Sequence, residues 1–109
     1  MSRFDGSVIT EQSQRDIVEQ IVPVLKKTPG LYLKVEGMAA QPPGVSAADV
    51  EATARDRTNA VLSFLAAQGI DPNRLIGSTL KPEHPNSPNE EDLRQDRKVV
   101  FTLVAPGGR

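Results

Sequence analysis

Residues 46–70 read SAADVEATARDRTNAVLSFLAAQGI, and this stretch predicts a long amphipathic helix. Ser46, with Asp49 three residues later, forms a variant of the capping box that starts helices. The apolar residues that follow recur at helical spacing and define one buried stripe, formed by Val50, Ala54, Val61 and Leu65. Gly69 is typical of a helix C-terminus, and Pro72 cannot continue the helix. A helix with a single apolar stripe must pack against another layer of structure.

The sequence before this helix predicts that layer. Residues 31–36 alternate between apolar and polar side chains, as a half-buried strand does. Residues 11–27 predict another helix, because their apolar positions recur at helical spacing, and Pro23 is expected to bend its last turn. Residues 4–9 could form a short edge strand, with Gly6 as a bend or bulge.

The sequence after residue 70 predicts two more strands, at 75–80 and 98–104, separated by a polar segment in which Ser87 caps one or two helical turns. The order is β-α-β-α-β-(short α)-β. It indicates an α+β fold with a four-stranded mixed sheet and two main helices packed on one face. We expect one domain over residues 1–109, with a core at about 4–104 and a flexible tail at 105–109.

The composition of the chain argues against several classes of function. The 109 residues carry a net charge of −1 and no basic run, which argues against nucleic-acid binding. Cysteine is absent, so disulfides and thiolate chemistry are excluded. No apolar run is long enough to span a bilayer, and we expect no direct membrane insertion by this chain. The N-terminus lacks a signal-peptide pattern, which suggests an excised domain.

Arg57 is the anomaly of the long helix. Its spacing from Ala54 and Val61 places it on the apolar stripe and not on the solvated face. A guanidinium cannot be buried without partners, because desolvation of the charge costs several kcal/mol. Two interpretations follow: Arg57 reaches the rim and pairs with an acid of its own domain, or it binds a ligand.

Three segments resemble an OmpA-like domain in order and spacing: LYLKVEG at 31–37, ARDRTNAVLSFLAAQGIDPNRL at 54–75 and LRQDRKVVFTLV at 93–104. The family pattern is Gly-His-Thr-Asp after the first of these strands, Leu-Ser-x-x-Arg-Ala-x-x-Val in the helix and Asn-Arg-Arg-Val at the last strand. The resemblance extends from RFDGSVIT to FTLV, essentially the whole chain. It implies non-covalent binding of peptidoglycan through the diaminopimelate of its stem peptide.

The resemblance implies an Asp for the ammonium group of diaminopimelate and an Arg for its carboxylate. The family Arg corresponds to Arg57, but the family Asp corresponds to Ala40, so the acid is lost. The last motif retains Arg97 and carries Asp96 in place of a neutral Asn. The ligand-binding candidates are therefore Arg57, Arg97 and Asp96. We hypothesise that Asp96 neutralises Arg57 within the domain.

Two functions remain open from the sequence. One is a structural or protein-interaction module that has lost diaminopimelate binding, and the other is a peptidoglycan anchor that uses Arg57, Arg97 and loop carbonyls. No set of nucleophile, base and orienting group is present, so we expect no enzyme, cofactor or metal, and a solvated side chain at His84. The resemblance implies the periplasm or cell envelope. The apolar loop 38–45 either binds a protein partner or packs on residues 81–97.

Overall fold

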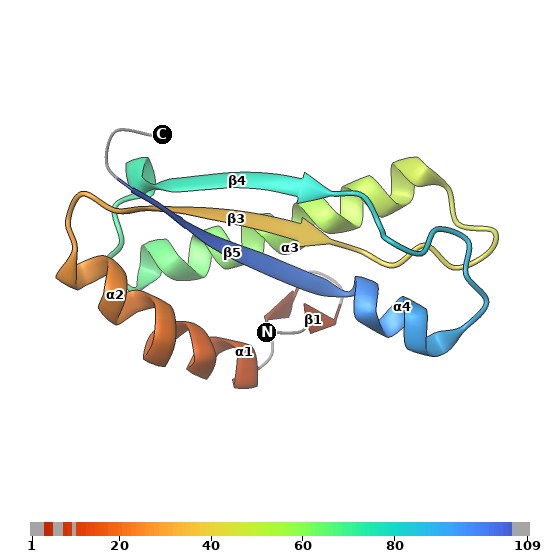
Figure 1. Ribbon diagram of the computed structural model, residues 1–109, viewed down its shortest axis with the longest axis horizontal. Helices are drawn as coiled ribbons and strands as arrows, with labels where there is room; N and C mark the ends of the chain where they lie inside the picture. Colours follow the sequence, from red (N-terminus) through yellow and green to blue (C-terminus); the bar gives the residue numbers. More distant parts are fainter. Residues whose placement is uncertain (1–3, 6–7, 10, 106–109) are drawn as a thin grey trace.

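The computed structural model describes residues 4–5, 8–9 and 11–105 (Figure 1). Its elements, in chain order, are β1 (Phe4–Asp5), β2 (Val8–Ile9), α1 (Glu11–Asp16), η1 (Ile17–Ile21), α2 (Val22–Lys27), β3 (Tyr32–Met38), α3 (Ala47–Ala67), η2 (Pro72–Arg74), β4 (Leu75–Leu80), α4 (Glu90–Asp96) and β5 (Lys98–Val104). The structure is an α+β fold, as the sequence predicts. None of the described helices combines the length and the apolar character that crossing a bilayer requires.

The predicted helix at 11–27 is present, but it contains a π-helical segment, η1, between α1 and α2. The N–H of Val22 is bonded to the carbonyl of Ile17, one residue further than in an α-helix. Pro23 follows directly, and a proline both lacks an N–H and crowds the carbonyl four residues before it. The chain therefore accommodates Pro23 by widening the preceding turn.

The helix α3 confirms the prediction for residues 46–70. The Ser46 side chain accepts a hydrogen bond from the backbone N–H of Asp49, which closes the N-terminus. Gly69 adopts a φ of +93°, a conformation that favours glycine, just beyond the C-terminal end. The buried residues of the helix lie on one side, and they are Val50, Ala54, Arg57, Thr58, Val61 and Leu65.

The main sheet has three strands in the order β4-β3-β5, and the prediction of four strands is wrong. β3 runs parallel to β4 and antiparallel to β5, so Val35 lies between Gly77 and Phe101. The predicted edge strand over residues 4–9 is instead two short strands, β1 and β2, that pair with each other. Only two residues separate them in sequence, so pairing within the segment has a small loop-closure cost.

The core lies between the sheet and the helices. Alternate residues of β3, Leu33 and Val35, are completely buried, whereas Tyr32 is exposed on the opposite face. The buried residues that pack with these two come from both helical regions, from the segment after α3 and from β5, and they are Ile17, Val22, Leu25, Val61, Leu65, Ile70 and Val99. One face of the sheet is therefore covered by helices, and α3 runs along β3 and β4 (Figure 1).

Candidate functional site

The end of β3 is held against the middle of α3 by Thr58. The backbone N–H of Gly37 donates to the Thr58 hydroxyl at 2.9 Å. The same hydroxyl lies 3.0 Å from the Ala54 carbonyl and 2.9 Å from the Ser78 carbonyl, which share its one proton. A Cβ at position 37 would lie 2.5 Å from the Thr58 hydroxyl and 2.6 Å from the Ala54 carbonyl. Gly37 therefore permits a backbone contact that any side chain would prevent.

Arg57 lies beside this contact and is only 5% exposed. Its Nη1 donates to the Met38 carbonyl oxygen at 2.9 Å, and this bond is not the only interaction of the residue. The sequence prediction that Arg57 lies on the buried stripe is confirmed. Because its guanidinium is bonded to the backbone at the end of β3, Arg57 links α3 to the loop in which the family motif would place its acid.

The loop after β3 packs onto its own domain. Ala39 is buried and packs with Val50 and Ala54 of α3. Further along, the backbone N–H of Asn86 donates to the Gln41 carbonyl at 2.8 Å. The second interpretation of this loop, packing on residues 81–97, therefore has direct support. Ala40, where the resemblance would place the acid, is partly buried and carries no charge.

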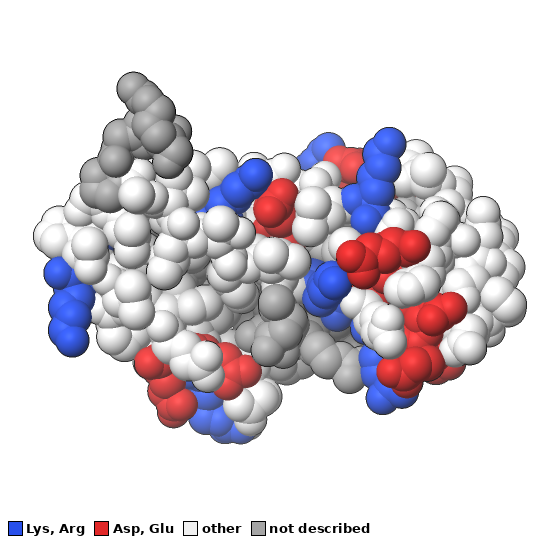
Figure 2. Space-filling model, viewed as in Figure 1, with Lys and Arg blue, Asp and Glu red and all other residues white. Residues whose placement is uncertain are grey.

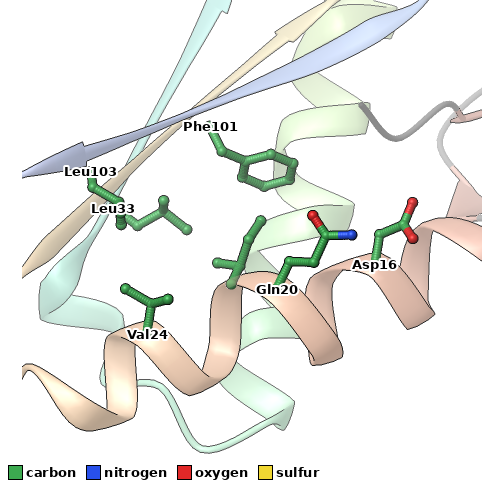
Figure 3. Close-up of a pocket in the computed structure, with 7 residues that line it drawn as sticks. Asp16, Gln20, Val24, Leu33, Phe101 and Leu103 are labelled. Atoms are coloured by element: carbon green, nitrogen blue, oxygen red, sulfur yellow. The ribbon is translucent and has the colours of Figure 1, made fainter.

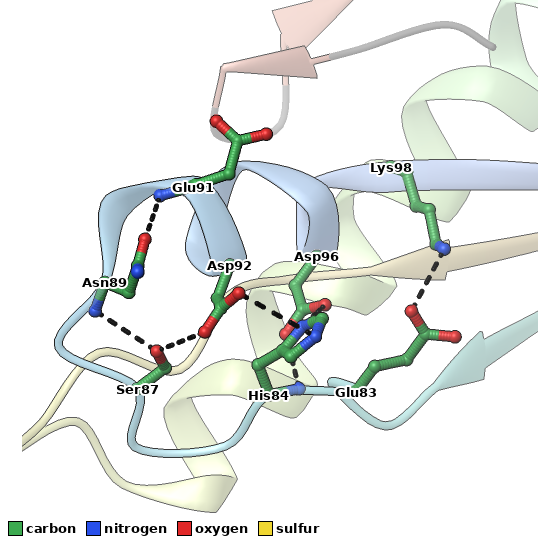
Figure 4. Close-up of polar contacts among 8 residues, drawn as sticks. All are labelled: Glu83, His84, Ser87, Asn89, Glu91, Asp92, Asp96 and Lys98. Atoms are coloured by element: carbon green, nitrogen blue, oxygen red, sulfur yellow. Dashed lines mark hydrogen bonds and ion pairs between the residues drawn. The ribbon is translucent and has the colours of Figure 1, made fainter.

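Asp96 is completely buried and is bonded to His84. One carboxylate oxygen accepts from the His84 backbone N–H at 2.8 Å, and the other lies 3.0 Å from the His84 Nδ1. The hypothesised pair of Asp96 with Arg57 is not among the contacts of the described residues. The polar loop after β4 supplies the partner instead, because it brings His84 against Asp96 at the C-terminal end of α4 (Figure 4).

His84 differs from the solvated side chain that we expected. Its side chain is 34% exposed, and its Nε2 lies 3.9 Å from a carboxylate oxygen of Asp92. The hydrogen bond to Asp96 is the main reason that the pKa of His84 is raised above its ordinary value of 6.5, and the charges of Asp92, Asp96 and Glu83 act in the same direction. The imidazole thus lies among carboxylates and favours a positive charge.

Arg97, the third candidate, forms a surface ion pair. Its Nη1 and Nη2 lie 3.0 and 3.4 Å from the two carboxylate oxygens of Glu90. Its role in ligand binding stays a prediction. Figure 2 shows acidic side chains gathered around α4 and the loop before it, the region to which Glu90 and Glu91 belong.

Two hollows lie outside these polar clusters. One, of about 330 Å³, separates the first helical region from β5, and Figure 3 shows its apolar side chains around Phe101. The other, of about 230 Å³, lies between the loop after β3 and the loop after β4, where Val50 and Leu80 meet Glu51 and Lys81. A third hollow, of about 440 Å³, lies beside the Thr58 contact between α3 and β4, where Arg55 and Ser78 line it.

The arrangement of α3 against a mixed β4-β3-β5 sheet defines an OmpA-like domain. The chain belongs to the OmpA family, whose model matches residues 3–98. No curated protein gives a significant match.

Solved structures share the fold at low sequence identity. The peptidoglycan-associated lipoprotein from Burkholderia pseudomallei is 20% identical, with a TM-score of 0.79 over 94% of this chain and 87% of that one. The OmpA-like domain of FopA1 from Francisella tularensis is 16% identical, with a TM-score of 0.76 over 96% and 70% of the two chains. The periplasmic domain of Helicobacter pylori MotB is 21% identical, with a TM-score of 0.72 over 94% and 70%.

Proposed function

We propose that this chain is a non-catalytic OmpA-like module that no longer binds diaminopimelate and acts as a structural or protein-interaction domain of the cell envelope. The observation that carries the proposal is the state of Arg57. Its guanidinium is buried and is bonded to the carbonyl of Met38, two residues before Ala40, which stands where the family has an acid. The family resemblance implies that an arginine at this position binds the carboxylate of the ligand.

Charge pairing explains why this combination disfavours the ligand. Diaminopimelate presents an ammonium group beside a carboxylate, and a closed site must satisfy both. Without the acid, the ammonium group would lose water and gain no counter-charge, which costs on the order of 2–5 kcal/mol. Arg57 would also have to exchange its bond to the Met38 carbonyl for one to the ligand. Both changes oppose binding.

Sedimentation with purified peptidoglycan sacculi tests the proposal. The wild-type chain should stay in the supernatant at micromolar concentrations. Ala40→Asp restores the missing acid and should increase the pelleted fraction, whereas Ala40→Asn, which has the same size without the charge, should not. Saturable pelleting of the wild type that is lost in Arg57→Ala would overturn the proposal.

The second function, a peptidoglycan anchor, is favoured by the fold shared with a peptidoglycan-associated lipoprotein. An anchor would use Arg57, Arg97 and loop carbonyls. The two functions differ in their response to Arg97→Ala: an anchor loses pelleting, while a module that has lost the site is unchanged.

The envelope location rests on the family and on the MotB neighbour, whose matched region is described as periplasmic. A protein partner is proposed because a domain without ligand chemistry functions through its surface. Crosslinking of the domain in envelope fractions, compared with cytosolic fractions, tests the location and the partner together. Recovery of crosslinked protein from the cytosolic fraction alone would contradict the location, and the absence of crosslinked species from both fractions would contradict the partner.

A further inference from the structure

Three potential metal ligands come together between the loop after β4 and the end of α4. Glu83, His84 and Asp96 each offer one ligand atom, and these atoms all lie within 4.8 Å of one another. Figure 4 shows the His84 ring between the carboxylates of Asp96 and Asp92, with Glu83 beside it. Glu83 and His84 come from the loop, while Asp96 ends α4, so the cluster joins two segments 12 residues apart.

The two ring nitrogens of His84 face different carboxylates. Nδ1 lies 3.0 Å from a carboxylate oxygen of Asp96, so an ion bonded to both atoms, at about 2.0–2.2 Å from each, would take the place of the proton that they now share. Nε2 is directed towards Asp92, at 3.9 Å. A histidine that binds metal through one nitrogen commonly donates from the other to a carboxylate, which fixes the ring. Asp92 is itself held by the Ser87 hydroxyl at 2.9 Å.

The cluster carries excess negative charge when the imidazole is neutral. Glu83, Asp92 and Asp96 are three carboxylates, and Lys98, whose Nζ lies 3.4 Å from Glu83, is the one full positive charge among the contacts in Figure 4. Asp96 is completely buried, so its charge is poorly screened by water. A divalent cation would balance the remaining two negative charges, which a single imidazolium cannot do.

We propose that Glu83, His84 and Asp96 bind Zn²⁺ or a similar divalent transition metal, with Asp92 orienting the histidine. An imidazole with carboxylates suits such ions, whereas Mg²⁺ and Ca²⁺ prefer oxygen ligands only. Glu83 must rotate towards the ion, and this rotation costs little free energy. Its side chain is 58% exposed, and the ion pair with Lys98 that it gives up lies at the surface. Water completes a three-ligand site.

Metal binding here would fasten the loop after β4 to α4. The loop already touches the loop after β3 through Asn86 and Gln41, so the ion would stabilise the whole end of the domain. Because an ion that binds only the folded state raises its stability, the melting temperature should increase with metal concentration. The site shares no residue with the Arg57 contact, so it is tested independently of the proposed function.

Calorimetric titration of the untagged, EDTA-treated full chain with ZnCl₂ tests the inference. We expect one ion per chain and a higher melting temperature with zinc. His84→Gln and Glu83→Gln should each weaken zinc binding at least about tenfold, and Asp92→Asn should weaken it about 10- to 100-fold, as changes in orienting residues do. Glu91→Gln removes a charge from the same helix outside the cluster and should bind as the wild type does.

Circular dichroism of each variant separates lost ligands from lost folding, since a folded His84→Gln chain reports on binding alone. In the wild type, zinc should also shift the His84 ring resonances in NMR spectra. Three results would overturn the proposal: no heat up to 1 mM zinc with an unmoved ring signal, equal affinity in folded His84→Gln, or equal affinity for Ca²⁺.

Discussion

Two polar clusters occupy the same end of this domain and are built in opposite ways. Around Gly37 and Thr58, polar atoms are buried and bonded to backbone groups, and Arg57 donates to the Met38 carbonyl. Around His84, three carboxylates surround one imidazole, and much of the cluster is open to solvent. The first cluster holds α3 to β3, while the second has a net negative charge that a bound cation can balance. Under the proposed function, the first cluster serves the fold although it lies on the family motif.

The largest effect is expected for Gly37→Ala. The added Cβ would lie 2.5 Å from the Thr58 hydroxyl and 2.6 Å from the Ala54 carbonyl, so β3 and α3 must separate. We expect a loss of about 4 kcal/mol in the free energy of unfolding, measured by urea denaturation. Gly44→Ala is the control: its φ of +90° adds strain of about 1 kcal/mol, but nothing lies within 4 Å of the new Cβ. Equal losses at both positions would contradict the close contact.

Arg57→Met should have the next largest effect. The substitution keeps an unbranched side chain but leaves the buried Met38 carbonyl without its donor, which costs about 2–3 kcal/mol in the free energy of unfolding. Urea denaturation measures it, and Arg55→Met is the control because Arg55 is an exposed residue of the same helix. A change within about 0.5 kcal/mol, typical of surface positions, would show that Arg57 does not hold the end of β3.

Thr58→Val should cost less, about 1–2 kcal/mol. Valine has the shape of threonine but cannot accept from the Gly37 N–H or donate to the Ser78 carbonyl. Hydrogen exchange at Gly37 should become faster along with the loss of stability. Thr53→Val is the matched control, because Thr53 is a partly buried residue of the same helix whose hydroxyl donates only within the helix, to the Asp49 carbonyl. Unchanged exchange at Gly37 in Thr58→Val would contradict the assigned bond.

The smallest expected effect is the pH dependence of stability in the metal-free protein. Asp96 raises the pKa of His84 in the folded state, so folding favours the protonated imidazole. The resulting stability is fully present below the ordinary pKa of 6.5 and is lost as pH rises through the raised pKa. Melting temperatures in EDTA should therefore fall across this interval in the wild type, and less steeply in His84→Gln. Parallel curves would contradict the assigned role of Asp96.

The sequence predicted those features that depend on local pattern. The capping of α3 by Ser46, its end near Gly69 and the buried position of Arg57 all follow from spacing along one helix. The alternation of β3 is equally local. These signals need no knowledge of distant parts of the chain, which is why they were reliable.

Features that depend on contacts across irregular segments were missed. The bond between His84 and Asp96 spans 12 residues of a proline-rich loop with no periodicity, so we predicted a solvated histidine and a different partner for Asp96. The fourth strand was predicted from β-forming residues at 4–9, but pairing within that segment competed successfully with pairing to the sheet. One cue was present in the sequence: Asp96 stands where the family has a neutral Asn. An acid at such a position requires a nearby hydrogen-bond donor once it is buried, as Asp96 is.

NMR observation of the Arg57 Nε–H group during titration with diaminopimelate tests the central claim most directly. A guanidinium bonded within the domain should keep its chemical shift and slow exchange up to millimolar ligand, in the wild type and in Ala40→Asn alike. A saturable shift of the Arg57 signal in the wild type, at concentrations that leave the Arg55 signal unchanged, would contradict the claim that this arginine serves the fold and not the ligand.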